Sequence, residues 1–512
     1  MKYLLKNFLL LTMVLIFANK SFSNGIKITN VIVLPNTNQI QFDVSWENSW
    51  RSDVLQNWDA AYIFMKYKNI SGLWTPLLFS ISNNSVPTGF NILIPPINFN
   101  NSTFYTGAFL YRSVSGSGTS NISGVKIGMP PNISTGVFDI KVFGIEMVYV
   151  PGGAYFLGDR NSSANSFRDL FTPTDPYYVQ DNTCLNLIDP IIPQTSIGFT
   201  NFPTGYNSFY CMKYETSQGA YRDFLNTLGY TAQINRTAFA PNSAVGTKAL
   251  TNSTTGRSYI EVATPGNAAN NTAAIYGCDA FNNNVFDEIN DGEYVVCNYL
   301  NWPDLAAYLA WAGLVPMTEL QFEKICRGPV QPTTGEFAWG NTLIATSPYN
   351  IVNNANDNEG ISNASTTNGN ANYAATSTGN VPFRNGIFAT ATSNRITSGG
   401  SYYGVMEMSG SVWERVVTTA NAEGRSYSGG STPLFLYFTT GNAYTISYDN
   451  WPGYNTGSID GTVPAFGLMY RGGSNSFPAT ELRVSNRTAP YVITLPDVIR
   501  YVDQGGRGVR NL

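Results

Sequence analysis

The stretch Gly404-Val-Met-Glu-Met-Ser-Gly-Ser-Val-Trp-Glu414 indicates the fold of this chain. Two small residues, Ser409 and Gly410, lie between apolar neighbours, and Trp413 and Glu414 follow them. Small residues at the centre of a short segment favour a tight backbone turn, and a tryptophan beside them favours a buried anchor. We therefore predict a turn that holds one aromatic side chain and one carboxylate next to each other.

Further motifs occur in order at 144–159, 209–216, 316–328, 337–340 (Phe-Ala-Trp-Gly) and 471–474 (Arg-Gly-Gly-Ser). Together they resemble the formylglycine-generating enzyme (sulfatase-modifying factor) superfamily, whose usual strings include G-N-V-W-E-W and R-G-G-S-W. The resemblance covers about residues 145–510, and the chain is similar to bacterial secreted members that lack the active-site cysteines. It implies an α+β, formylglycine-generating-enzyme-like domain, rich in irregular loops, at 145–512.

The composition excludes several classes of protein. Of the 512 residues only 12% are charged, 14% are aromatic, and the net charge is −4. Few charges and many aromatic residues favour a well-buried, loop-rich fold over a disordered chain. We see no cluster of lysine and arginine that would make a basic face, so we expect no nucleic-acid partner. The absence of histidine removes the usual general base near neutral pH and the commonest transition-metal ligand.

The N-terminus has the pattern of a secretory signal. Lys2 and Lys6 precede an apolar run at 8–18, and the small residues Ser21 and Ser23 follow it. A membrane anchor is the alternative, but the run is short for a membrane span. We predict a signal peptide at 1–23, no membrane span after its removal, and a secreted, periplasmic or cell-surface protein.

Export permits disulfides, and an odd number of cysteines leaves at least one unpaired within the chain. The five cysteines are Cys184, Cys211, Cys278, Cys297 and Cys326. Cys278 and Cys297 flank one polar loop, so they are the pair that we favour. Cys326 lies in an apolar helical segment, which predicts a buried thiol.

Residues 24–135 have the pattern of an all-β unit. Four apolar residues alternate with polar ones at the period of a half-buried strand, namely Ile40, Phe42, Val44 and Trp46. Similar runs at 62–67 and 106–111 are separated by turn-forming residues. We predict a β-sandwich-like domain at 24–135, with a small barrel as the alternative, and a boundary at 136–145. This unit shows no cluster of acids, cysteines or glycines that would carry a reaction, so a structural or binding module is expected.

Three helices are predicted from their end signals. Thr216 would cap the first, which has apolar residues at helical spacing and Gly229 as its stop. The second would begin at Asn301 and end at Gly313. The third would begin at Thr318, which has capping-box spacing to a glutamine.

The segment 365–398 is rich in Asn, Thr, Ala and Gly and has almost no charge. Such a composition is typical of a loop without regular secondary structure. We predict a long surface loop at this position, which would be an insertion in the domain.

The resemblance implies a copper site, because family members that make formylglycine hold Cu(I) with two cysteines close after the Gly-Gly-Ser element. Soft thiolate ligands suit that ion. Here the run Gly472-Gly-Ser-Asn-Ser-Phe-Pro-Ala-Thr-Glu-Leu482 has no cysteine, and Phe477 lies near the expected first position. A second branch of the superfamily, the sulfoxide synthases, places iron on histidines, and this chain has none. Neither copper nor iron is therefore expected.

The resemblance also implies structural calcium, bound through an A-N-I-W segment and through G-N-V-W-E. Asn350 and Ile351 match the first segment, and Glu414 keeps the carboxylate of the second, where Ser411 replaces the asparagine. A hydroxyl is a weaker and shorter ligand than an amide oxygen. The alternative is that Glu414 caps a turn or pairs with an arginine.

A second calcium candidate comes from spacing alone. Asp279, Asn283 and Asp287 have the first, fifth and ninth positions of a calcium loop. Phe281 breaks the third position, and Asn290 stands where a bidentate glutamate is wanted. The alternative is a solvated turn of Asn and Asp residues.

Arg471, Arg483 and Arg487 lie close together in the sequence, in an aromatic-rich neighbourhood. They would either bind a carboxylate ligand or pair with Glu407, Glu414 or Glu481 in the core. The function predicted from these observations is a non-catalytic binding or surface-assembly module with a protein or glycan partner at the cell envelope. The alternative is an oxidoreductase that uses copper to oxidise a protein cysteine, or an unrecognised activity in the same cleft.

Overall fold

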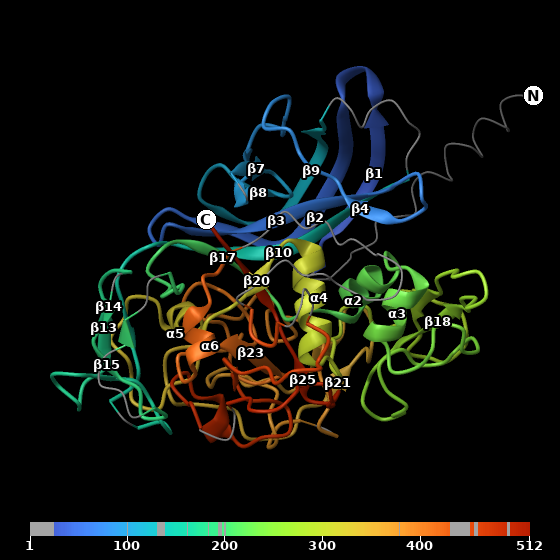
Figure 1. Ribbon diagram of the computed structural model, residues 1–512. Helices are drawn as coiled ribbons and strands as arrows, with labels where there is room; N and C mark the ends of the chain where they lie inside the picture. The colour runs from blue at the N-terminus through green and yellow to red at the C-terminus, as the bar shows by residue number, and fades with distance from the viewer. Residues whose placement is uncertain are drawn as a thin grey trace, which may run out of the picture.

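Figure 1 shows a computed structural model of the chain. It describes residues 25–99, 101–130, 139–160, 162–182, 184–192, 197–198, 201–377, 379–430, 451–454, 459–488 and 492–512. The predicted signal peptide at 1–23 lies outside these residues. Among the described residues, no helix is long and apolar enough to cross a membrane.

Strands account for 30% of the structure and helices for 11%, so sheet and irregular loop dominate. One sheet has the strand order β1-β2-β3-β10-β17-β26-β20, with β4 and β8 paired to β3, β5 paired to β8 and β9 paired to β2. Its strands are β1 (Lys27–Leu34), β2 (Gln39–Ser52), β3 (Asn57–Lys68), β4 (Trp74–Pro76), β5 (Phe90–Leu93), β8 (Ala108–Arg112), β9 (Gly116–Gly128), β10 (Ile140–Val150), β17 (Phe209–Met212), β20 (Val315–Pro316) and β26 (Gly508–Asn511).

The remaining strands form small sheets of two or three strands. They are β6 (Ile97–Phe99), β7 (Ser102–Phe104), β11 (Tyr155–Leu157), β12 (Arg168–Asp169), β13 (Tyr177–Val179), β14 (Cys184–Leu185), β15 (Leu187–Ile188), β16 (Ile197–Gly198), β18 (Ile260–Thr264), β19 (Ile275–Cys278), β21 (Ile351–Val352), β22 (Gly360–Ile361), β23 (Trp413–Val417), β24 (Leu468–Arg471) and β25 (Gln504–Gly505).

Strand β3 separates two apolar cores. Alternate residues of this strand, such as Ala61 and Ile63, pack in a core with Phe42 and Trp46 of β2. The residues between them, such as Tyr62, pack in the main core of the molecule. A strand that is buried on both faces ties the layers on its two sides together. The alternation predicted for 40–46 is confirmed, because all four apolar residues are buried.

Strand β10 crosses the boundary that we predicted at 136–145. It pairs with β3 from Ile140, opposite Tyr67, to Val148, opposite Asp59, and its last four residues, Met147 to Val150, also pair with β17. One sheet therefore runs from the N-terminal strands into the rest of the chain, and in Figure 1 the N-terminal strands lie above that sheet junction. The domain limits 24–135 and 145–512 remain predictions.

The helices begin close to the expected residues, but the first ends at Leu225, and Gly229, its predicted stop, is the N-cap of the next helix. The second and third predicted helices are confirmed, with capping boxes at Asn301 and Thr318 and a left-handed glycine, Gly313, after the second. The first is capped by Ser217, one residue later than predicted, because Thr216 instead donates to the Gly506 carbonyl at 3.0 Å. The helices are α2 (Gln218–Leu225), α3 (Tyr230–Arg236), α4 (Trp302–Ala312), α5 (Glu319–Arg327) and α6 (Ala422–Ser426).

Replacing Gly313 with alanine is expected to lower the free energy of unfolding by about 1–2 kcal/mol. Gly313 has a φ of 72°, and an added Cβ would lie 3.0 Å from the Tyr62 hydroxyl. Urea unfolding followed by tryptophan fluorescence measures this loss. Gly360→Ala is the matched control, because Gly360 lies in a strand with its nearest contact at 3.6 Å. Equal unfolding midpoints for the two variants would contradict the expectation.

The predicted surface loop at 365–398 is wrong in part. Segments 370–373 and 383–388 are largely buried, because Tyr373, Phe383 and Phe388 fill two small apolar clusters. The segment has no helix or strand among its described residues, as expected, but it packs into the molecule.

The predicted pairing of Cys278 with Cys297 is also wrong. Both are buried free thiols, as are Cys211 and Cys326, and nothing is described of the Cys184 side chain. Different segments fix the two residues in place. The Cys278 amide donates to Asp287 at 2.8 Å, and the Cys297 amide donates to the Thr216 carbonyl at 2.8 Å. The prediction of a buried thiol at Cys326, in α5, is confirmed.

Candidate functional site

The predicted turn at 404–414 is present, and backbone geometry explains its small residues. Gly410 has a φ of 97° and Ser411 a φ of 74°, two successive residues in the left-handed region. A Cβ at Gly410 would lie 2.6 Å from the Asn372 carbonyl oxygen, which accepts the Ser411 amide at 2.8 Å. Ser409 donates its hydroxyl to the Leu482 carbonyl at 2.8 Å. Close backbone approach therefore requires glycine at this position.

The turn leads into strand β23, which places Trp413 beside the C-terminal motif. Strand β23 pairs with β24 on one side and with β25 on the other. The Trp413 ring meets Phe477 edge-on, with ring centroids 5.2 Å apart. The Ser474 hydroxyl donates to Asp503 at 3.2 Å. The position expected for a metal-binding thiol thus carries an aromatic ring that is packed against the tryptophan.

Two of the three arginines near the C-terminal motif, Arg471 and Arg487, make buried ion pairs. Arg471 donates to Glu319 at 3.0 Å and to Glu323 at 2.8 Å. Arg487 donates to Asp189 at 2.7 Å and to Glu319 at 2.6 Å. All five side chains are buried. The predicted core pairing is confirmed for Arg471 and Arg487, with other acids as the partners, whereas Arg483 makes no ion pair within 4.0 Å among the described residues.

Glu414 pairs with Arg507, whose Nε donates to Oε2 at 2.7 Å. Ser411 donates its hydroxyl to Glu215 at 2.6 Å. Burial raises the pKa of Glu215 well above its usual range, and the Glu414 carboxylate adds to this effect while Arg507 opposes it. Sequence reasoning missed both Glu215 and Arg507, because neither lies near the turn in the chain.

Two of the calcium candidates, Ser411 and Glu414, therefore already have partners, and the partner of Glu414 is a cation, Arg507. Ser411 and Glu414 are occupied by a carboxyl group and a guanidinium, which is the arginine pairing that we weighed against calcium. Asn350 and Ile351 lie at the start of the small β21–β22 hairpin, where the Asn350 amide donates to Asn363 at 2.8 Å. Arg507 holds one oxygen of the Glu414 carboxylate, and the other, Oε1, has no hydrogen-bond partner among the described residues, so calcium at this position stays a prediction.

The second set of calcium candidates does not converge on one point. Asp279 accepts the amides of Asn283 and Asn284 at 3.2 and 2.8 Å, which closes the turn from inside. Asp287 instead accepts Arg222 at 2.6 Å. Among the described residues, no group of three or more His, Cys, Asp or Glu side chains is arranged to hold a metal ion.

The four described thiols are poor ligands as well as scattered. Cys211 lies in β17, Cys278 in β19, Cys326 in α5, and Cys297 in a loop. Burial raises the pKa of Cys211 to about 12, and it raises the pKa of the other three well above the usual value. A thiolate is what binds a soft metal, and these thiols stay protonated near neutral pH.

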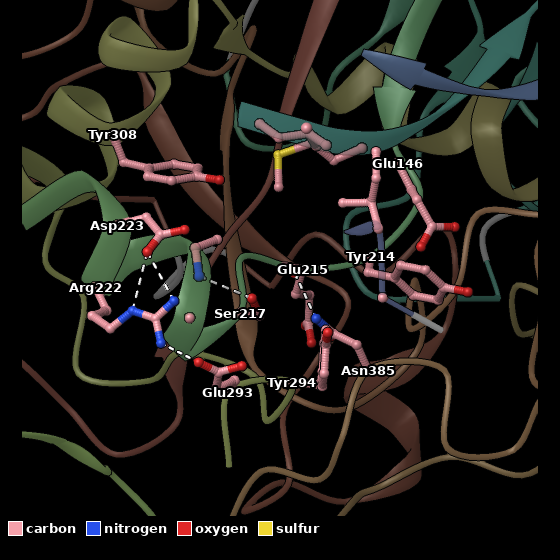
Figure 2. A pocket seen from close by; sticks show the side chains of 17 residues that line it. Glu146, Tyr214, Glu215, Ser217, Arg222, Asp223, Glu293, Tyr294, Tyr308 and Asn385 are labelled. Carbon is pink, nitrogen blue, oxygen red and sulfur yellow. Dashed lines mark hydrogen bonds and ion pairs between the residues drawn. The ribbon is translucent and has the colours of Figure 1, made fainter. Parts of the chain in front are cut away.

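A cavity of about 230 Å³ lies between β10, the segment after β17, and helices α2 and α4 (Figure 2). Arg222 in α2 lines the cavity and is paired with Asp223 at 2.8 Å and with Glu293. Glu146 of β10 lines the cavity and receives Lys213 at 2.9 Å. No sequence pattern pointed to this cavity, because its wall comes from segments far apart in the chain.

The shared sheet, the capped helices and the glycine turn with its tryptophan define a domain of the kind that builds formylglycine-generating enzymes. The family model of the sulfatase-modifying factor enzyme 1-like domain matches residues 142–497. The match covers more than half of the chain, so the chain belongs to this family. A comparison with curated proteins found no match.

Proposed function

We propose that this protein is a secreted, non-catalytic member of the sulfatase-modifying-factor family that acts as a binding or surface-assembly module. The observation that carries the proposal is the segment 472–482, which lacks cysteine and packs Phe477 against Trp413. A phenyl ring offers no soft donor to Cu(I). The fold is that of an enzyme family, and the ligands of its metal chemistry are missing.

Copper chemistry through other residues is not favoured. The described thiols lie on four separate segments and are held in the protonated form by burial. An iron site of the histidine type has no ligands in this sequence. A binding role requires neither thiolate nor histidine ligands, so it is compatible with their absence.

The secreted location rests on the signal pattern at 1–23. A sandwich-like module at 24–135 is supported by the separate apolar core that β2 and β9 form with β3 and β8. Such a module beside an enzyme-derived domain suits a protein or glycan partner at the cell envelope. These assignments form part of the proposal.

Metal analysis of the purified mature protein tests the proposal. We expect no copper or iron above trace levels after incubation with either ion, and no formylglycine in a cysteine-containing peptide incubated with the protein, Cu(I) and oxygen. Stoichiometric copper together with oxygen-dependent loss of the peptide thiol would overturn the non-catalytic assignment. Phe477→Ala serves as a control, because it opens the site without adding a sulfur ligand and should remain inactive.

The same samples test calcium, which remains a prediction from the resemblance and from loop spacing. Thermal melts with and without a chelator compare the two states. An ion that binds only the folded protein raises the melting temperature with its concentration. A melting temperature that falls on chelation would confirm calcium, and an unchanged one would contradict it.

A further inference from the structure

Lys213 lies between two buried carboxylates from two different strands. Its Nζ donates to Asp59 Oδ2 of β3 at 3.0 Å and to Glu146 Oε2 of β10 at 2.9 Å, and it also donates to the Asn48 carbonyl at 3.1 Å. The three charged side chains are at most 3% exposed. Because burial removes the hydration of both charges, a neutral form of an amine and an acid costs less here than at the surface. The fold thus holds a lysine amine against a carboxyl group where bulk water is excluded.

The carboxyl group of Asp59 is held in a polarised state. Its Oδ1 accepts the Ser49 hydroxyl at 2.9 Å and the Trp50 amide at 2.9 Å, and its Oδ2 accepts Trp46 Nε1 at 3.1 Å. Two donors on one oxygen stabilise the negative charge that develops there when a nucleophile attacks the carboxyl carbon. The second carboxyl group is less suited to attack, because Glu146 Oε1 has no hydrogen-bond partner among the described residues.

Glu146 has the properties of a group that moves protons between the amine and the acid. Burial raises the pKa of Glu146 to about 7; Lys213 opposes this shift, while Asp59 adds to it. A carboxyl group with a pKa near neutral can both accept and give a proton. Burial also disfavours the ammonium of Lys213, but Glu146, Tyr214 and the other carboxylate outweigh it and hold the lysine pKa well above its usual range. A reaction at this site therefore starts from the charged pair and needs a neighbour that transfers its protons.

We propose that Lys213 and Asp59 form an intramolecular isopeptide bond, with Glu146 as the proton shuttle. The ammonium gives one proton to Asp59 Oδ2, and the neutral amine attacks Cγ, so that a bond forms between Nζ and Cγ. Glu146 takes a second proton from Nζ at Oε2 and delivers it to Asp59 Oδ2. The bond between Cγ and Oδ2 breaks, and this oxygen leaves as water with both protons. The condensation needs no oxidant or co-reactant, and Glu146 returns to its starting state.

Fixed geometry favours this condensation inside the folded protein. An amine and a carboxylic acid in dilute solution remain an ion pair, but well-oriented groups within one molecule react as if at about 10⁵–10⁸ M. The Trp50 ring lies with its centroid 4.9 Å from Lys213 Nζ and covers the amine on one side. Exclusion of water also opposes the reverse reaction, which is hydrolysis of the new amide.

The bond would join two regions that are 154 residues apart in the sequence. Asp59 belongs to the N-terminal strand β3, and Lys213 follows β17 of the family domain. A cross-link of this kind restricts the unfolded chain much as a disulfide does. The four described cysteines are free thiols, so the isopeptide bond would supply a covalent tie that they do not. None of the reacting residues lies in the segment 472–482, so the bond can form whether or not the protein oxidises cysteine.

Mass spectrometry of the mature protein under denaturing conditions tests the proposal. We expect an intact mass about 18 Da below that of the sequence, because one water is lost. Trypsin does not cleave after a lysine whose amine is an amide, so it should release peptide 52–66 joined to peptide 169–222. A full intact mass in protein that shows a cooperative melting transition, or a linear peptide 52–66, would overturn the proposal and leave a buried ion pair only.

Two variants assign the roles. Lys213→Arg keeps the positive charge, but its guanidinium is no nucleophile, so this variant should have the full mass. Glu146→Gln keeps the shape without the shuttle, so the cross-linked fraction in freshly purified protein should fall about tenfold. Lys248→Arg is the matched control, because Lys248 pairs with one acid, Glu261, at 2.8 Å, and it should lose water as the unmodified protein does. A joined peptide in Lys213→Arg, or undiminished cross-linking in Glu146→Gln, would overturn the assignment.

Discussion

Replacing Arg487 with methionine is expected to lower the free energy of unfolding by about 3–5 kcal/mol. Arg487 makes two hydrogen bonds to Asp189, at 2.7 and 2.9 Å, and two to Glu319, at 2.6 and 3.0 Å. All three side chains are buried. Removing the guanidinium leaves Asp189 without a cation in the low-dielectric interior, and that costs more than the lost bonds alone. Urea unfolding followed by tryptophan fluorescence measures the effect.

Two further variants keep this expectation testable if Arg487→Met fails to fold. Arg487→Lys keeps the charge but cannot bind two carboxylates with paired bonds, so an intermediate loss is expected. Arg483→Met is the matched control four residues earlier, because Arg483 makes no ion pair within 4.0 Å among the described residues. A loss in Arg483→Met as large as that in Arg487→Met would contradict the role of the network.

The free energy of unfolding at low pH should also depend on Glu319, which pairs with both Arg487 and Arg471. Burial alone would raise the pKa of Glu319, but Arg487 and Arg471 outweigh it and lower the pKa to about 2. The folded state thus holds this proton less tightly than the unfolded chain. The stability from Glu319 is present above about pH 4.5 and is lost as the pH falls toward 2. This acid dependence should be smaller in Arg487→Lys, where one of the two cations is less well placed.

The sequence predicts local structure well because its signals are local. The capping residues Asn301 and Thr318 make their bonds within three residues, so α4 and α5 begin where the pattern indicates. The start of α2 differs by one residue because Thr216 and Ser217 can both cap a helix. A contact of Thr216 with Gly506, 290 residues away in the sequence, decides between them.

The site could not be predicted to the same degree, because its contacts are distant in sequence. Nothing near Glu414 indicates Arg507 as its partner, since 93 residues separate them. The surface-loop prediction for the segment 365–398 fails in part for a related reason. Its polar composition indicates exposure, yet Asn370 and Asn372 are buried and donate to backbone carbonyls inside the fold. Composition alone cannot distinguish a solvated asparagine from one that satisfies buried backbone.

Replacing Lys213 with methionine is expected to destabilise the N-terminal strands and the family domain together, by about 3–5 kcal/mol. Lys213 follows β17 and donates to Asp59 of β3 at 3.0 Å and to Glu146 of β10 at 2.9 Å. It also donates to the Asn48 carbonyl of β2 at 3.1 Å. Among the described residues, Lys213 is the cation that lies within 4.0 Å of both Asp59 and Glu146. Its loss therefore leaves these two acids buried without a cationic partner.

Differential scanning calorimetry distinguishes one cooperative unit from two. Because β10 pairs with β3 and with β17, we expect a single transition that moves to lower temperature in Lys213→Met. Lys27→Met is the matched control, since Lys27 also comes from an N-terminal strand and faces Asp357 across the junction, but at 3.9 Å and 42% exposed. An exposed pair of that kind contributes about 0–1 kcal/mol. Two separate transitions, of which one stays at its original temperature in Lys213→Met, would show that the shared sheet does not couple the N-terminal strands to the family domain.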